Sequence, residues 1–163
     1  MIREKSEPSG TYPQLVMGLL EGTWPAGEAE AMTYLQQHGF TPEPGTRTCS
    51  GSQCHGEMAT PFPYVTGHWT VTEGTLESVS LFPVQTSPTD RAILRDQFDL
   101  LAIELTDVLG NPTTESGMFS APQSAWYSAD ATVSLDCHWA SERTGLIQLA
   151  IERSHQLAQR ATR

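Results

Sequence analysis

The residues best suited to bind a metal lie close together between Cys49 and His55. Cys49, Cys54 and His55 offer two thiolates and an imidazole at nearly the spacing that zinc sites use. A fourth ligand would come from Cys137 or His138, but adjacent residues in a strand point to opposite faces. One Cys-x4-Cys pair without a second pair is a weak zinc motif. We therefore expect no metal here, and these three residues are weak candidates only.

The cysteines also allow two interpretations without a metal. The chain has three cysteines, and an odd number fits reduced thiols better than a secreted disulfide framework. We therefore expect Cys49 and Cys54 to be free thiols in a loop and Cys137 to be a core residue. A disulfide between Cys49 and Cys54 is the second alternative.

No complete catalytic motif accompanies these residues. The stretch His55-Gly56-Glu57 matches the H-x-E half of a zinc deaminase, but the P-C-x-x-C half does not occur. H-E-x-x-H, G-x-S-x-G and G-K-[S/T] are missing too. The only lysine is Lys5, so a lysine nucleophile or a pyridoxal cofactor is not expected. We predict a protein that is not an enzyme and holds no cofactor.

The histidines do not change this expectation. His68 and His138 project from predicted strands, on the faces opposite the neighbouring tryptophans. Solvated histidines on strands are much commoner than catalytic ones, so we expect both to be surface residues.

Acidic side chains dominate the middle of the chain. The formal net charge is −10, and no basic residue occurs between Arg95 and Arg143. That stretch holds eight acids: Asp96, Asp99, Glu104, Asp107, Glu115, Asp130, Asp136 and Glu142. A negative surface repels nucleic acid and anionic membranes and attracts cationic proteins. Solubility alone is the alternative explanation of this charge.

The candidate binding residues combine these acids with aromatic side chains, because aromatic anchors carry much of the binding energy at interfaces. The partner is expected to be a protein with a basic surface, bound by a monomer or weak dimer, without nucleic acid or membrane. The candidates are Asp96, Asp99, Asp107, Asp130, Asp136, Tyr64, Trp126 and Tyr127.

The chain is expected to form one domain. Its 163 residues suit a single domain, which we place at residues 11–153. Residues 1–10 are predicted to be a disordered tail, and residues 154–163 a helical or frayed one. No apolar run is long enough to span a bilayer, so a cytoplasmic location is expected.

The predicted elements alternate between helices and antiparallel strands. Helices are expected over residues 13–20 and 26–38, and the Pro- and Gly-rich stretch 41–62 reads as loop with at most one short edge strand. A hairpin turning at Glu73-Gly74 joins strands 64–72 and 75–84. The remaining elements are a helix over 87–109, capped by Ser87, Pro88 and Asp90 and buried through Leu94, Phe98, Leu101, Leu105 and Val108, and strands over 118–127, 131–139 and 145–153.

This order predicts an α+β fold. An antiparallel β-sheet of about five strands would carry a long central helix and an N-terminal helix packed on one face.

Three segments resemble an actinobacterial family of immunity-like proteins encoded near polymorphic toxins. The segments are Tyr34–Phe40, Val108–Thr113, and Ser124–Tyr127 followed by Val133–Leu135. The resemblance covers about residues 26–152, and the Cys49–Cys54 loop is outside its pattern. It implies a protein that binds a toxin and blocks its active site, with no catalytic residues to carry over.

The resulting hypothesis is a non-enzymatic immunity protein that neutralises a toxin enzyme through an acidic surface. A secretion chaperone, which is often dimeric and holds an effector segment, is the first alternative. An acidic mimic of nucleic acid is another, and a zinc enzyme built on Cys49, Cys54 and His55 is the last.

Overall fold

The computed structural model describes residues 11–86, 91–116, 121–138 and 145–153. Several expectations lie outside these residues. They concern the helix start at 87–90, the strand start at 118–120, Trp139, the turn at 141–143 and both tails.

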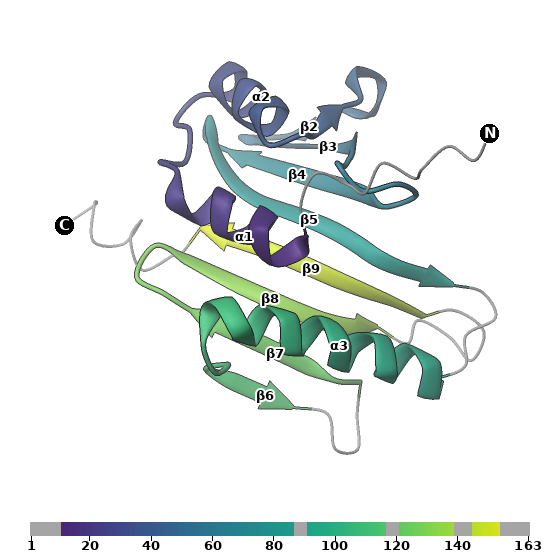
Figure 1. Cartoon of the computed structure of the whole chain (residues 1–163). Coiled ribbons are helices and arrows are strands. Elements are labelled where there is room, and N and C mark those ends of the chain that lie inside the picture. The colour runs from purple at the N-terminus through teal and green to yellow at the C-terminus, as the bar shows by residue number, and fades with distance from the viewer. Residues whose placement is uncertain (1–10, 87–90, 117–120, 139–144, 154–163) are drawn as a thin grey trace, which may run out of the picture.

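A single antiparallel sheet of nine strands forms the body of the described fold (Figure 1). Its order is β1-β3-β4-β5-β9-β8-β7-β6, and β2 also pairs with β3. The strands are β1 (Thr41–Pro42), β2 (Thr48–Ser50), β3 (Gln53–Ala59), β4 (Thr66–Thr72), β5 (Thr75–Thr86), β6 (Thr114–Ser116), β7 (Gln123–Tyr127), β8 (Ala131–His138) and β9 (Gly145–Arg153).

The last strand joins two parts of the sheet that are far apart in the sequence. Strands β3 to β5 form one meander, and β6 to β9 form another. Strand β9 pairs with β8 on one side and with the long strand β5 on the other. The centre of the sheet therefore depends on contacts between residues about 70 positions apart, such as Leu81 with Leu149.

Three α-helices cover one face of this sheet (Figure 1). They are α1 (Tyr12–Glu21), α2 (Glu28–Gln37) and α3 (Arg91–Leu109). Helix α1 begins with a capping box between Thr11 and Gln14, which satisfies free amides of its first turn. Helix α2 ends at Gly39, whose φ of +86° suits glycine. A short 3-10 helix, η1 (Pro44–Thr46), lies between β1 and β2.

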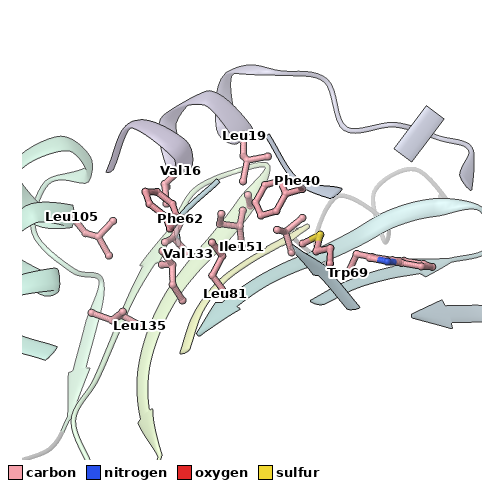
Figure 2. Packing of buried hydrophobic residues seen from close by; sticks show 14 of the residues in the cluster. Val16, Leu19, Phe40, Phe62, Trp69, Leu81, Leu105, Val133, Leu135 and Ile151 are labelled. Carbon is pink, nitrogen blue, oxygen red and sulfur yellow. The ribbon is translucent and has the colours of Figure 1, made fainter. Parts of the chain in front are cut away.

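The core lies between the helices and the covered face of the sheet (Figure 2). Val16 and Leu19 of α1 and Leu105 of α3 are completely buried, as are Leu135 and Ile151 of the sheet. In β8 and β9 every second side chain is buried up to residue 149, as expected for strands with one face on the core. Within the described ranges, no helix lies over the other face of the sheet (Figure 1), which carries polar side chains such as Ser134 and Gln148.

The α+β class and the antiparallel sheet are confirmed, but the expectation of about five strands was wrong. Residues 41–62 hold β1, β2 and β3 rather than a loop, and β6 was also missed. Strand β3 lacks an apolar pattern because Gly56 takes a core position, where a Cβ would stand 2.7 Å from the Trp69 ring. Gly56 leaves room for the Trp69 ring, but without an apolar side chain at this position the sequence of β3 does not show the alternating pattern of a strand.

Helix α3 is placed as expected, with one error in its buried stripe. Leu94, Phe98, Leu101 and Leu105 are buried, whereas Val108 is 44% exposed. Leu109 packs against the core instead. The helix then ends at Gly110, whose φ is +82° and whose amide donates to the carbonyl of Thr106.

Candidate functional site

The predicted metal ligands do not come together. Cys49 and Cys54 face each other in the β2–β3 pair and form a disulfide, with Cα atoms 4.1 Å apart. The expectation of free thiols in a loop was therefore wrong, and the second alternative holds. Side chains alternate along β3, so His55 points to the face opposite Cys54. Sulfurs joined to each other cannot act as thiolate ligands, and the described residues contain no other group of three suitable ligands.

An ion pair connects this hairpin to helix α2. Arg47 donates to both carboxylate oxygens of Glu28, from Nε at 2.6 Å and from Nη2 at 3.0 Å. The hydrogen bond from Arg47 lowers the pKa of Glu28. The same Nη2 also donates to Cys54 Sγ at 3.6 Å. One guanidinium thus contacts the first turn of α2 and the disulfide.

The open face of the sheet carries a short chain of polar contacts across three strands. His138 Nε2 of β8 lies 3.1 Å from Gln148 Oε1 of β9. Gln148 Nε2 in turn donates to Ser80 Oγ of β5 at 3.3 Å. A histidine that activates a serine needs a direct hydrogen bond to its hydroxyl. Gln148 stands between His138 and Ser80, so these residues do not form such a pair.

Two predicted binding residues, Tyr127 and Asp136, line one shallow groove on the open face. The groove runs along β6, β7 and β8, with a volume of about 300 Å³. Partial burial raises the pKa of Asp136, although His138 and a hydrogen bond involving Ser134 act in the opposite direction. Tyr127 is 56% exposed at the other end of its strand pair.

The other predicted aromatic anchors lie elsewhere. Trp126 is only 5% exposed, and its Nε1 donates to the carbonyl of Gly110 at 2.9 Å. It closes the core beneath the end of α3, so its prediction as a surface anchor was wrong. Tyr64 is fully exposed in the loop before β4, with a φ of +61°. Asp130 is exposed in the β7–β8 turn, beside a hollow that Arg153 and Trp24 also line.

The outward side of α3 brings together most of the remaining predicted acids. Asp96, Asp99 and Asp107 are all exposed on this helix. We define the α3 outer face as Ile93, Asp96, Asp99, Leu100, Ile103, Glu104 and Asp107. Each of these positions has another member of the set three or four residues away, so together they form one continuous strip on the helix. The strip lies opposite the buried residues Leu94, Phe98, Leu101 and Leu105.

Three large apolar side chains in this strip were missed in the sequence. Ile93, Leu100 and Ile103 are 60%, 57% and 61% exposed. Their spacings of seven and three residues are a helical signal, which could have found them once the buried stripe was removed. Exposed apolar side chains surrounded by polar ones often mark a protein-interaction surface. Arg91 and Arg95 are on the same helix but outside the strip.

The predicted binding set is thus divided between two sides of the molecule. Helix α3 packs on β8 and β9 at the covered face (Figure 1). Asp136 and Tyr127 belong to the opposite, open face of the same strands. One compact partner would contact either the α3 outer face or the open-face groove, but it would not cover both.

Among the described residues, no helix combines the length and the apolar character needed to cross a membrane.

Comparison with known proteins gives one match. No curated protein and no solved structure matches the chain. A family of unknown function (DUF6301) matches residues 12–141. This stretch includes both the disulfide hairpin and α3. Because the match spans far more than half of the chain, the protein belongs to this family.

Proposed function

We propose that this protein is a non-enzymatic immunity protein, which binds a toxin enzyme with a basic surface and neutralises it. The α3 outer face carries the proposal. There three exposed apolar side chains lie among the carboxylates of Asp96, Asp99, Glu104 and Asp107. Apolar contacts supply affinity, and acidic neighbours favour a cationic partner and accelerate its association.

The chemistry of the α3 outer face favours a foreign partner over a second copy of this chain. Two copies meeting through this strip would bring like charges together at its rim, and the net charge of each chain is already −10. A partner with lysine or arginine around an apolar patch would match both parts of the strip. This is the reason for preferring a monomeric inhibitor over a dimeric secretion chaperone.

The open-face groove takes no part in this proposal. Asp136 is partly buried there, and this burial disfavours its charged form. We therefore assign binding to Asp96, Asp99 and Asp107, and leave Asp136 and Tyr127 outside the contact. The proposal retains the cytoplasmic location expected from the sequence.

Co-expression with the toxin domain that this proposal expects beside the chain's gene would test the function. The native chain should protect a bacterial host from that domain, and the purified pair should bind more weakly as salt rises. Reversing three charges, in Asp96→Lys with Asp99→Lys and Asp107→Lys, should abolish protection and weaken binding at least tenfold.

A matched control separates the α3 surface from net charge. Lysine in place of Glu43, Glu57 and Glu115 changes the net charge by the same amount, and these three exposed residues are outside α3. This control should protect as the native chain does. If both triple variants lost protection equally, the α3 outer face would not be the binding surface.

Failure of the native chain to bind the proposed toxin or to protect against it would overturn the function. A stable homodimer lost with the α3 reversal would favour the chaperone, and displacement by duplex DNA would favour the mimic.

A further inference from the structure

The two sulfurs of the Cys49–Cys54 disulfide lie in different surroundings. Strand β2 is exposed along its whole length, and Cys49 is its middle residue. Cys54 is only partly exposed on β3, where it packs against the edge of the core. An attacking thiolate must reach one sulfur directly, so access favours attack at Cys49.

The only cation that is described in contact with this disulfide touches Cys54. Arg47 Nη2 donates to Cys54 Sγ at 3.6 Å, while Nε and Nη2 hold the carboxylate of Glu28. A guanidinium next to a sulfur stabilises its thiolate, which lowers the pKa of the thiol. A sulfur with a lower thiol pKa is also the better leaving group in disulfide exchange. Access and charge therefore give the two cysteines different roles.

We infer that the Cys49–Cys54 pair is a directional thiol-exchange site for low-molecular-weight thiols. A small thiolate attacks Cys49 Sγ and forms a mixed disulfide with it. The Cys49–Cys54 bond breaks, and Cys54 leaves as a thiolate beside Arg47. A second small thiolate then attacks the mixed disulfide at the sulfur of the bound small thiol and releases Cys49. The protein disulfide is reduced by two electrons, and two small thiols are oxidised to one small disulfide.

This site is separate from the surface proposed to bind a toxin. The hairpin lies beside the first turn of α2, whereas the α3 outer face belongs to another helix that packs on β8 and β9. The two proposals therefore fail independently, and exchange is measured on the protein without any partner.

The position of the mixed disulfide tests the direction of attack. The native protein would be treated briefly with 2-mercaptoethanol, quenched with excess N-ethylmaleimide at mildly acidic pH, and digested for peptide mass spectrometry. We expect the mercaptoethanol adduct on Cys49 and the maleimide adduct on Cys54. Adducts mainly on Cys54 would overturn the proposal. Adducts on Cys54 would mean that Arg47, which contacts Cys54, attracts the incoming thiolate to that sulfur instead of stabilising it as the leaving group.

A pair of neighbouring variants tests the role of the cation through opposite changes. Arg47→Gln removes the charge beside Cys54, and the first step should slow about threefold or more, because the leaving thiol becomes a weaker acid. Glu28→Gln keeps Arg47 and removes the carboxylate that neutralises it, so the same step should be at least as fast as in the native protein. Equal rates in both variants, or a slower step in Glu28→Gln alone, would contradict the proposal.

The pKa of Cys54 gives a measurement that does not depend on the disulfide. Cys49→Ala leaves Cys54 as a free thiol in the full chain, and its pKa can be read from the pH dependence of alkylation. We expect a value below the ordinary thiol pKa of about 8.5. Adding Arg47→Gln should raise it. A pKa unchanged by that second substitution would remove the electrostatic part of the proposal.

Discussion

Helices α2 and α3 cover the same face of the sheet, but their outward sides differ. The exposed residues of α2 are Ala29, Glu30, Thr33, Gln36 and Gln37, all small or polar. Helix α3 exposes Ile93, Leu100 and Ile103 between its acids. Both helices bury an apolar stripe, and packing on the sheet accounts for the placement of apolar residues on α2. The same packing does not account for the apolar residues on the outward side of α3. These additional exposed apolar residues suggest a partner.

The inward sides of the two helices should be equally important for stability. Leu35 of α2 and Leu105 of α3 are both completely buried. Replacing either leucine by alanine should lower the free energy of unfolding by about 2–5 kcal/mol, from lost burial and the cavity left behind. Urea titrations followed by circular dichroism would measure both. A cost under 1 kcal/mol for only one variant would mean that its helix is not part of a shared core.

The ends of the two helices offer a finer comparison, because both stop at a glycine with positive φ. At Gly110 an added Cβ meets no atom within 4 Å, so Gly110→Ala should cost only the backbone strain of about 1–2 kcal/mol. At Gly39 the same Cβ would stand 3.1 Å from Pro61 Cβ. Gly39→Ala should therefore be the more destabilising in urea unfolding. The reverse order would show that the α2 end relaxes more easily than its packing suggests.

Acid should weaken the end of α2 through His38. Burial lowers the pKa of His38 in the folded chain, while an unfolded histidine has a pKa of about 6.5. The folded state thus holds the proton less tightly. Stability is full above this unfolded value and falls as the pH drops towards the folded pKa.

Urea titrations at pH 7 and at about pH 5.5 should show this loss in the native chain and a smaller loss in His38→Gln. Carboxylates that titrate in this range are shared by both proteins, so they cancel in the comparison. Identical losses would assign the pH dependence to groups other than His38.

The smallest change in stability is expected on the outward sides. Leu100→Gln on α3 and Gln36→Leu on α2 exchange the two surface types, and each should alter the free energy of unfolding by less than about 0.5 kcal/mol. Only Leu100→Gln should weaken binding to the proposed toxin partner, by about tenfold, in isothermal titration calorimetry. If Gln36→Leu weakened binding as much, the contrast between the helices would not carry the proposed function.

Strongly patterned segments were predictable from the sequence. Strand β9 has the bounds expected for it, and the β4–β5 turn falls at Glu73-Gly74. In both places, alternating apolar residues and a local turn signal agree. The apolar stripe of α3 was also predictable, except at Val108, which is exposed while Leu109 packs against the core.

The missed features depend on contacts between distant residues. Gly56 is a core position only because Trp69 of the next strand fills the space above it. Cys49 and Cys54 form a disulfide because the register of β2 and β3 places them opposite each other, which counting cysteines does not reveal. Trp126 was expected at the surface, but the end of α3 covers it. Asp96 and Asp136 lie on opposite sides of the sheet, and this separation can be recognised only when the topology is known.

The central place of β9 has a consequence for the order of folding. Strands β5 and β8 each have an apolar face and an edge that only β9 pairs. While a ribosome is still making residues 145–153, these two edges remain open. Exposed strand edges are templates for pairing with other chains, and pairings between distant residues form slowly. The nascent chain is therefore prone to aggregate before β9 emerges, and a chaperone that shields β5 during synthesis would raise the yield of folded protein.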